Sequence, residues 1–556
     1  MKFSSKSLSQ TITQLCLVKG IEHIVISPGS RNAPLVIGFT EQDGFTNYSI
    51  VDERCAAFFA LGLAQQLRRP VAVVCTSGSA LLNYYPAVAE AFYSDIPLVV
   101  ISADRPEHLV EIGDGQTIIQ EGVFHNHILY NANCREGEQH RQHNETAINA
   151  ALNTAIELMG PVHINVPFSE PLYETVDDLI LRPQHVPART NTESLPPDFE
   201  AFQQIWNESG RKMILSGVME PESIDREVIE KLAQDPSLVV LTETTSNLHH
   251  EKFFPAIDQL ITNIPPEHIS ELRPHLLITF GGMIVSKRIK AFLRTNPPAH
   301  HWHIDSKKAY DTFFALTEHF RNTPDYFLKA LTNTPQPLNS GYRDFWLGRK
   351  QLKLEKHREF LEEVPFSDLK AYEIVFRSLP VGSQLQVANS AAIRYTQLFK
   401  INPEIEVYCN RGTSGIDGST STAVGAAVAS AKPVVMLSGD LSFFYDSNAL
   451  WNAYIPKSFR IIVVNNSGGG IFRILPGAKE VKDFSDYFET RHNLNARHLC
   501  EMYNLSYRSA DNPGDLEQQL KDFYNPSETA GLLEIFTPAE KNDMILQDYF
   551  KSISQL

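Results

Sequence analysis

The chain reads PVVMLSGDLSFFYDSNALWNAYIPKSFRIIVVNNSGGGIF over residues 433–472, and this segment indicates a parallel α/β sheet. Two continuous apolar runs, VVML and IIVV, end in Gly439-Asp440 and in Asn465-Asn466, with a helix-length segment between them. Apolar strands that end in turn residues and alternate with helices are typical of parallel sheets covered on both faces. The segment therefore predicts two parallel strands whose carboxyl ends lie at one edge of a sheet.

The same pattern recurs along the whole chain of 556 residues. Its apolar runs are IEHIVISPG, NYSIV, VAVVCTSG and IPLVVISAD in the first part, KMILSG, SLVVLTE, HLLITFGG and HHWHID in the middle, and QLQVANS before the segment above. Two stretches rich in Pro, Thr and Asn, residues 183–198 and 333–341, have the composition of linkers. We therefore predict three doubly wound α/β domains with parallel sheets, at residues 1–182, 183–362 and 363–556.

The first and third parts of the chain resemble each other. Pro70 precedes VAVVCTSG and Leu98 opens LVVIS, while Pro433 precedes VVMLSGD and Ile461 opens IIVVN. Both pairs share one offset, since 433 − 70 and 461 − 98 are each 363. Strand–helix–strand units at one offset predict two domains of common topology.

Composition excludes several classes of protein. With 43% hydrophobic and 21% charged residues, the chain has the apolar side chains for full cores, which argues against a disordered or coiled-coil protein. The net charge of −16 opposes binding to nucleic acid. The sequence has neither a secretory signal pattern nor a run of about 18 apolar residues, so we expect a cytoplasmic protein that spans no membrane. The six cysteines form no C-x-x-C pair, as expected for buried thiols in a reducing compartment.

Polar residues follow the two strands of the 433–472 segment. Asp440 and Asn466 are 26 residues apart, but side chains at the carboxyl ends of adjacent parallel strands converge. The Asp440 carboxylate, the Asn466 carbonyl and a backbone carbonyl near Gly468 would be oxygen ligands for Mg²⁺, with room for diphosphate oxygens. The glycines allow a phosphate to approach closely. The alternative is that Asp440 and Asn466 are ordinary turn residues at two strand ends.

The segment resembles the thiamine-diphosphate signature, in which GDG is followed about two dozen residues later by NN. Leu441 stands where that signature has its second glycine. A thiamine-diphosphate enzyme also needs a carboxylic acid at N1′ of the cofactor pyrimidine, and Glu53 in YSIVDERCAAFFALGLAQ resembles that residue. We expect burial to raise the pKa of Glu53, so that it exchanges a proton with the pyrimidine. Alternatively, Glu53 only complements the dipole of the helix that it begins.

Six motifs narrow the resemblance. They are SPGSRNAPL (27–35), VDERCAAFFALGLA (51–64), ISADRPEHL (101–109), NSAAIR (389–394), NRGTSGIDG (410–418) and NNSGGGIFRILP (465–476). Over essentially its full length the chain resembles the 2-succinyl-5-enolpyruvyl-6-hydroxy-3-cyclohexene-1-carboxylate synthase family of the menaquinone pathway, in which GDL replaces GDG. The resemblance implies a carboligase that decarboxylates 2-oxoglutarate with thiamine diphosphate and Mg²⁺, for which Mn²⁺ can substitute. The succinyl carbanion equivalent then adds to isochorismate by conjugate addition.

The resemblance also assigns roles to individual residues. By resemblance, the catalytic residue is Glu53; the cofactor-binding residues are Glu53, Ile416, Asp440, Asn466, Ile471 and Phe472; the metal ligands are Asp440, Asn466 and Gly468; and the substrate-binding residues are Ser30, Arg31, Arg105, Gln116, Lys287, Ser390, Arg394, Arg411, Phe472 and Leu475. The cations lie at or beside strand ends that contain Gly or Ser, where guanidinium groups clamp carboxylates. Each cation taken alone is also explained by a solvated surface position, and Arg288 is an alternative to Lys287.

The central part has neither G-x-G-x-x-G nor G-x-x-x-x-G-K-[ST], so nothing in it indicates FAD, NAD or ATP. We expect a structural domain without a cofactor that contributes Lys287. The resemblance further implies a homodimer or a dimer of dimers, with the first domain of one subunit facing the third domain of its partner. Two other functions stay open: another thiamine-diphosphate 2-oxoacid decarboxylase or acetohydroxyacid-synthase-like enzyme, and a catalytically silent binding protein on the same scaffold.

Overall fold

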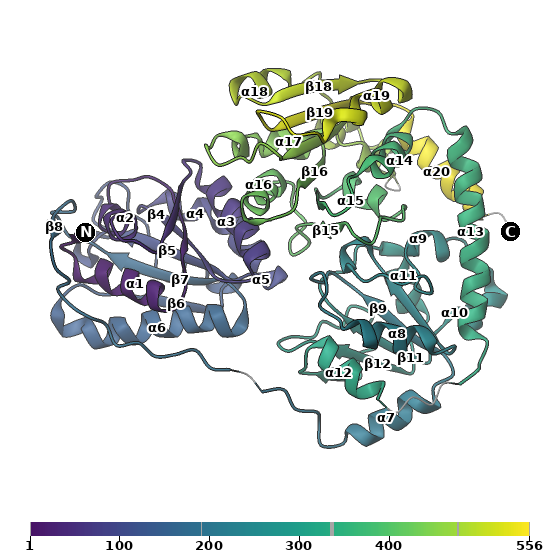
Figure 1. The fold of residues 1–556 in the computed structure, drawn as a ribbon, viewed down its shortest axis with the longest axis horizontal. Coiled ribbons are helices and arrows are strands. Elements are labelled where there is room, and N and C mark those ends of the chain that lie inside the picture. Colours follow the sequence, from purple (N-terminus) through teal and green to yellow (C-terminus); the bar gives the residue numbers. More distant parts are fainter. Residues whose placement is uncertain (1, 191, 334–337, 475–476, 555–556) are drawn as a thin grey trace.

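Three parallel sheets covered by helices make up the fold of the computed structural model, which describes residues 2–190, 192–333, 338–474 and 477–554. Figure 1 shows the first domain at the left, the third at the top and the central one at the lower right. The predicted α/β class with doubly wound parallel sheets is confirmed. All six cysteines are buried, as predicted. No helix within the described ranges is both long and apolar enough to cross a membrane.

The first sheet has six parallel strands in the order β3-β2-β4-β5-β7-β6. The strands are β2 (His23–Ile26), β3 (Thr46–Ser49), β4 (Val71–Cys75), β5 (Leu98–Asp104), β6 (Tyr130–Asn133) and β7 (Val162–Pro167). The helices are α1 (Ser7–Val18), α2 (Ala33–Thr40), α3 (Glu53–Leu67), α4 (Ser79–Asn83), α5 (Tyr85–Ser94) and α6 (Arg141–Leu158). Side chains of α3 and α5 join the core on one face of the sheet, and those of α1, α2 and α6 join the core on the other. A short antiparallel pair that the sequence did not predict, β1 (Phe3–Ser4) with β8 (Thr175–Val176), lies beside this sheet.

The third sheet also has six parallel strands, in the order β15-β14-β16-β17-β19-β18. The strands are β14 (Gln384–Val387), β15 (Glu406–Tyr408), β16 (Val434–Gly439), β17 (Arg460–Asn465), β18 (Ser506–Ala510) and β19 (Gly531–Phe536). The helices are α14 (Asp368–Ser378), α15 (Ala391–Thr396), α16 (Ser419–Ala429), α17 (Asp440–Tyr445), α18 (Arg497–Met502), α19 (Pro513–Phe523) and α20 (Asn542–Ser554). Ranked along the chain, the strands of both six-stranded sheets follow the order 2-1-3-4-6-5, so the common topology predicted for these two domains is present.

Helices α3 and α16 join the first and third domains. Their backbones approach so closely that a Cβ on Gly62 would lie 2.1 Å from the carbonyl oxygen of Thr422, and one on Gly425 would lie 2.0 Å from that of Phe59. Only glycine tolerates such an approach. One continuous apolar core therefore contains strand residues of both sheets, such as Val73.

The central sheet has five parallel strands in the order β10-β9-β11-β12-β13. The strands are β9 (Lys212–Ser216), β10 (Leu238–Thr242), β11 (Leu276–Phe280), β12 (His300–Ile304) and β13 (Glu318–Phe320). The helices are α7 (Phe199–Glu208), α8 (Arg226–Gln234), α9 (Ile257–Leu260), α10 (Ile269–Leu272), α11 (Lys287–Thr295), α12 (Pro324–Leu331) and α13 (Tyr342–Glu363). Each face of this sheet has its own apolar cluster, which confirms double winding.

The two predicted linkers differ in structure. Residues 183–198 form no helix or strand where they are described, but their start is not loose, because Val186 N–H donates to Asn149 of α6 at 2.9 Å. The second stretch, whose residues 334–337 lie outside the described ranges, leads into α13. Figure 1 shows α13 running along the right side from the central to the third domain.

Candidate active site

The carboxyl edge of the third sheet holds most of the predicted cofactor residues. Asp440 begins α17 directly after β16, and Asn466 follows β17. Both line a cavity of about 140 Å³. The predicted residues that line it are Ser390, Ile416, Asp440, Asn466, Gly468, Ile471 and Phe472. Leu475 lies outside the described residues. The predicted convergence of Asp440 and Asn466 is therefore present in this chain.

Hydrogen bonds orient the two polar side chains. Asp440 Oδ1 accepts from the N–H of Leu441 at 2.7 Å, and Asp440 Oδ2 accepts from the N–H of Gly468 at 2.9 Å. Asn466 Nδ2 donates to Asp368 Oδ2 at 2.9 Å, which fixes the orientation of the amide. Asn466 Oδ1 is buried and accepts no hydrogen bond from the described residues. A buried acceptor without a partner costs about 1–3 kcal/mol, and binding a hard cation would remove that cost. This oxygen is therefore suited to be a metal ligand.

Gly468 cannot be replaced without strain. Its φ is +147°, and a Cβ there would lie 2.7 Å from the carbonyl oxygen of Glu489. The segment after Glu489 supports the turn, since Gly469 N–H donates to Glu489 O at 2.6 Å and His492 N–H donates to Ser467 O at 3.3 Å. The backbone beside Asp440 is thus held open by a glycine turn, as a bound diphosphate would require.

Two residues of this site were not predicted from the sequence. His492 Nε2 lies 3.2 Å from Asp440 Oδ2, although His492 belongs to none of the motifs. Asp368, at the start of α14, holds the Asn466 amide, accepts from Thr537 Oγ1 at 2.5 Å, and has its pKa raised to about 6 by burial. Only the fold brings Asp368 to the cavity and His492 to Asp440, so no local signal marked them.

The loop of residues 410–418, which carries Arg411 and Ile416, is anchored by Glu90 of α5. This glutamate is 1% exposed. Its Oε1 accepts from the N–H of Gly412 at 2.7 Å and from Ser94 Oγ at 2.7 Å. Its Oε2 accepts from the N–H and the Oγ1 of Thr413 at 2.6 and 2.8 Å. One signal for Glu90 was available, because it is an acidic residue inside the apolar run AVAEAF.

Glu53 begins α3 in the first domain and is half-buried. Burial, and to a lesser extent the charge of Asp52, raises the pKa of Glu53, in the direction expected. Asp52 caps the helix by accepting from the N–H of Cys55 at 3.1 Å. The described lining of the Asp440 cavity runs from Asp368 to Phe472 and includes no residue of the first domain. A single chain therefore does not bring Glu53 into that cavity.

Two predicted cations meet at the carboxyl edge of the first sheet. Arg31 is 5% exposed and donates to the carbonyl oxygen of Phe168 at 2.8 Å, and burial followed by the charge of Arg105 lowers its pKa. Arg105 donates to the carbonyl oxygen of Gly115 at 3.2 Å. The Nε atoms of both arginines are buried and make no hydrogen bond with the described residues. Ser30 and Gln116, from the flanking loops, are exposed.

A second group of cations lies where the third domain meets the central one. Burial and the charge of Arg411 lower the pKa of Arg394, while Asp258 opposes this effect. Lys290 of α11, which the sequence did not single out, also has its pKa lowered by burial and by Arg411. Lys287 is exposed at the start of the same helix.

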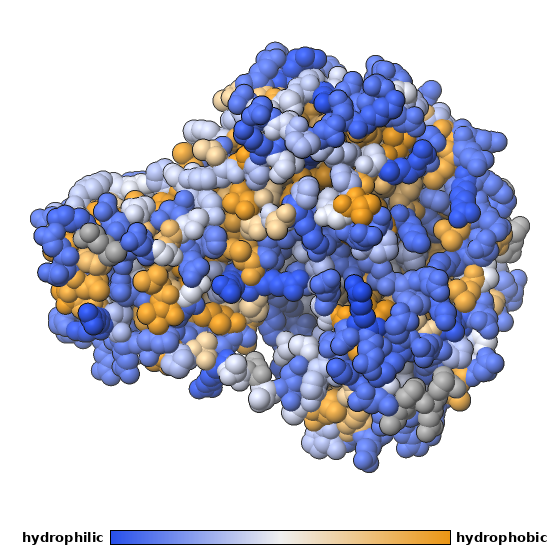
Figure 2. Space-filling model, in the orientation of Figure 1, coloured by the Kyte–Doolittle hydropathy of each residue, from blue (hydrophilic) through white to orange (hydrophobic). Residues whose placement is uncertain are grey.

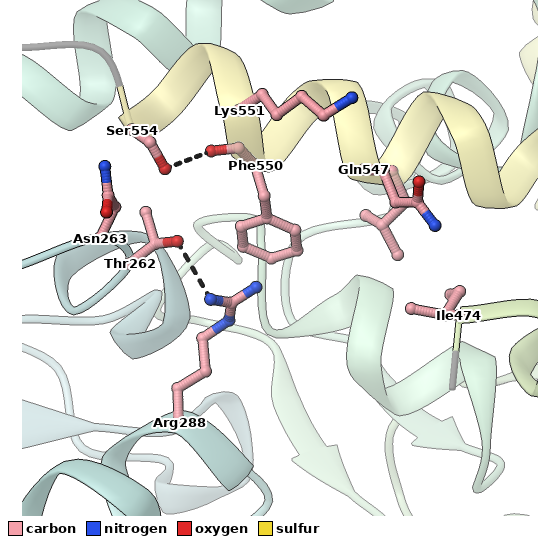
Figure 3. A pocket seen from close by; sticks show the side chains of 9 residues that line it. Thr262, Asn263, Arg288, Ile474, Gln547, Phe550, Lys551 and Ser554 are labelled. Atoms are coloured by element: carbon pink, nitrogen blue, oxygen red, sulfur yellow. Dashed lines mark hydrogen bonds between the residues drawn. The ribbon is translucent and has the colours of Figure 1, made fainter. Parts of the chain in front are cut away.

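Arg288 is not an equivalent of Lys287. It donates to Thr262 Oγ1 at 3.1 Å and lies over the Phe550 ring, with 4.2 Å from Cζ to the ring centroid. Figure 3 shows it pointing into a separate cavity of about 840 Å³ between the central domain and α20. Among the predicted site residues that the structure describes, none lines that cavity.

Comparison with protein families agrees with this geometry. Three family models match the chain: "Thiamine pyrophosphate enzyme, N-terminal TPP binding domain" over residues 6–131, "Middle domain of thiamine pyrophosphate" over 191–362, and "Thiamine pyrophosphate enzyme, C-terminal TPP binding domain" over 390–535. Fold, site and family models together define a three-domain thiamine-diphosphate-dependent enzyme.

Similar curated proteins narrow the family. A protein of Flavobacterium johnsoniae named 2-succinyl-5-enolpyruvyl-6-hydroxy-3-cyclohexene-1-carboxylate synthase is 56% identical over 100% of both chains. Proteins of the same name from Flavobacterium psychrophilum and Porphyromonas gingivalis are 55% and 37% identical, over 98% and 99% of this chain and 99% and 98% of their own. The chain belongs to the 2-succinyl-5-enolpyruvyl-6-hydroxy-3-cyclohexene-1-carboxylate synthase family.

Proposed function

We propose that this protein is a thiamine-diphosphate-dependent transferase that decarboxylates 2-oxoglutarate and adds its succinyl unit to isochorismate in menaquinone biosynthesis. The product is 2-succinyl-5-enolpyruvyl-6-hydroxy-3-cyclohexene-1-carboxylate. The observation that carries the proposal is the cavity where the Asp440 carboxylate, the unpaired Asn466 Oδ1 and the Gly468 turn meet. Full-length identity of 53–56% to three relatives with this name supports the choice of substrates.

The cofactor residues would act as a cradle. Asp440, Asn466 Oδ1 and the Gly468 carbonyl supply oxygen ligands for Mg²⁺, or for Mn²⁺ in its place. The apolar walls of the cavity, which exclude water, are formed by Ile416, Ile471 and Phe472. When bound, thiamine diphosphate supplies the electron sink for loss of CO₂.

Glu53 would hold a proton at N1′ of the pyrimidine. Its raised pKa favours the protonated acid, which is the form that donates to a ring nitrogen. Since Glu53 is not part of the Asp440 cavity, we infer that a second copy of the chain contributes it, in a homodimer or a dimer of dimers. The first domain exposes large apolar side chains on loops near Glu53 and Gln116 in sequence, namely Val51 at 45%, Ile112 at 66% and Ile119 at 60%. Figure 2 shows apolar side chains gathered on one face of this domain, at the left.

The two groups of cations would bind the substrate carboxylates. Arg31, Arg105, Ser30 and Gln116 come from the first domain, and Ser390, Arg394, Arg411 and Lys287 come from the third and central domains. Paired guanidinium groups suit carboxylates, and the buried, unpaired Nε atoms of Arg31, Arg105 and Arg411 supply free donors. By family resemblance we add Leu475 to the substrate-binding set.

The enzyme would be cytoplasmic, and each of its domains would have a separate role. We assign pyrimidine binding to residues 1–182 and diphosphate binding to residues 363–556. Residues 183–362 would form a domain without a cofactor.

Mass-spectrometric product analysis tests the function. The purified protein is incubated with Mg²⁺, thiamine diphosphate and 2-oxoglutarate, with and without isochorismate. An adduct that carries the succinyl unit and requires isochorismate is the expected result. Succinic semialdehyde alone would support a 2-oxoacid decarboxylase with another acceptor, and no consumption despite bound cofactor would refute the proposed substrates.

A further inference from the structure

Glu243 of the central domain is a buried carboxylate for which the proposed reaction has no role. It follows β10 at the carboxyl edge of the central sheet and is 2% exposed. Its Oε2 accepts from the N–H of Val285 at 2.7 Å, and its Oε1 accepts from the N–H of Ser286 at 2.7 Å. These two residues directly precede α11, whose first residue is Lys287. Glu243 therefore holds the backbone from which Lys287 projects.

A second carboxylate secures the same helix start. Ser286 caps α11 by accepting from the N–H of Ile289 at 3.1 Å, and its hydroxyl donates to Asp258. Lys290, one turn further, donates to the carbonyl oxygen of Ile284 at 2.9 Å. Hydrogen bonds to Glu243, Asp258 and Lys290 thus fix the loop before α11.

The same carboxylates face the third domain. Glu243 and Asp258 share with Arg394 and Gln397 a cavity of about 10 Å³, which has room for no more than one water. Gln397 Oε1 accepts from the N–H of Thr244 at 3.0 Å, so α15 is tied to the residue after Glu243. Lys287 and Arg394 consequently depend on one buried junction between two domains.

The two carboxylates of the junction, Glu243 and Asp258, offset the charge of the nearby cations. Arg394, Arg411 and Lys290 have like charges, and Arg411 lowers the pKa of the other two. Asp258 favours the charged form of Arg394, and Glu243 favours that of Lys290. Removing a carboxylate would leave the cations to repel one another in a poorly solvated place.

We propose that Glu243 is a positioning residue for substrate binding, which sets the place of Lys287 relative to Arg394 and Arg411. The inference rests on the proposed function, in which these three cations bind substrate carboxylates. Glu243 touches neither substrate nor cofactor in this role. The central domain then acts by fixing the spacing of cations that belong to two domains.

Protonation of Glu243 would weaken this arrangement. Burial raises the pKa of Glu243 to about 7, against the hydrogen bonds from Val285 and Ser286, which lower it. The charge of Asp258 also raises this pKa, and the charge of Arg411 lowers it. Lys290 and Arg394 are the other charged groups at the junction. A protonated carboxyl turns one acceptor oxygen into a donor, which faces a backbone N–H. The wild-type KM for the affected substrate should therefore rise as the pH falls below about 7.

The test is steady-state kinetics of the holoenzyme with Glu243→Gln between pH 6 and 8.5. We expect KM for at least one substrate to rise about tenfold while kcat changes less than about twofold, because only binding geometry is lost. The low-pH rise in KM should disappear in this variant, and the thiamine diphosphate requirement should stay as in the wild type. Asp311→Asn is the matched control, because Asp311 also accepts two backbone N–H groups in the central domain, from Ala315 and Leu316 at 2.8 and 3.0 Å.

A double-mutant cycle separates positioning from general destabilisation. In a Lys287→Ala background, Glu243→Gln should have little further effect on KM. Additive effects, an unchanged KM, or an equal effect of Asp311→Asn would overturn the inference. If Glu243→Gln does not fold, Glu243→Asp should raise KM and keep its pH dependence, and a wild-type KM would refute the role. A wild-type enzyme that forms no adduct would instead refute the proposed function.

Discussion

Replacing Glu90 by Gln should release the loop that carries Arg411 and Ile416. The substitution keeps the size of the side chain and leaves α5 intact. It changes the acceptor that receives four hydrogen bonds from Gly412, Ser94 and Thr413. An amide NH₂ group would face donors at one of the two oxygen positions.

The geometry gives the size of the effect. Each oxygen of Glu90 accepts from one loop N–H and from one hydroxyl. A hydroxyl can turn to accept from the amide NH₂, so the N–H of either Gly412 or Thr413 loses its acceptor whichever way the amide turns. A hydrogen bond to a charged group contributes about 1.5–3 kcal/mol, so the anchored loop should lose about 1.5–3 kcal/mol relative to the released loop. Since 1.4 kcal/mol is a factor of ten, the apparent Kd for Mg²⁺–thiamine diphosphate should rise about 10- to 100-fold.

Two measurements check this reasoning. Hydrogen–deuterium exchange should become faster over residues 410–418, and a cofactor titration should show the weaker binding. Glu193→Gln is the control, because Glu193 likewise accepts from the N–H and Oγ1 of Thr323, at 2.5 and 2.9 Å, but in the central domain. Unchanged exchange over 410–418 together with an unchanged cofactor Kd would show that Glu90 does not anchor the loop.

Three further substitutions address the cofactor site and its pH dependence. Glu53→Gln should retain cofactor binding and lose turnover, because the amide supplies no exchangeable acid. NMR measures proton exchange at the thiazolium C2, and retained turnover would remove Glu53 from the mechanism. Gly468→Ala should weaken Mg²⁺ binding at least tenfold, because a methyl group 2.7 Å from the Glu489 carbonyl forces the turn to move; an unchanged Mg²⁺ titration would contradict this. For Asp368 the folded-state pKa of about 6 lies above the ordinary value of 3.8, so its protonated form stabilises the fold and that contribution is lost as the pH rises from about 4 to 6. Asp368→Asn should therefore flatten the pH dependence of the unfolding free energy of the cofactor-free protein over this window, by up to about 3 kcal/mol, and an unaltered slope in denaturant titrations would argue against the raised pKa.

Sequence alone predicted the parts of the site that lie at strand ends. Asp440 and Asn466 follow buried apolar strands, and parallel pairing brings such positions to one edge. The duplication was predicted for the same reason, because central strands are continuous apolar runs. Edge strands were harder to recognise: β6 and β18, with the sequences YNAN and SYRSA, are partly exposed and polar, so no hydrophobic run marks them.

The residues that the sequence did not predict form contacts with residues far away in sequence. Glu90 binds a loop 322 residues away, and Glu243 binds one 42 residues away. His492 reaches Asp440 from a segment with no motif. Hydrogen bonds of this kind depend on domain packing rather than on periodicity or spacing, so a single sequence does not identify both partners.

The glycine contact between α3 and α16 makes the molecule less modular than its three domains suggest. Gly62 and Gly425 place two backbones in contact within one apolar core, so neither duplicated half buries its helix without the other. The central domain has two apolar clusters of its own, and it adjoins the rest through a linker, α13 and the polar junction around Glu243. The protein should consequently unfold as two cooperative units rather than three, and cutting the gene between its two repeats would divide a single core.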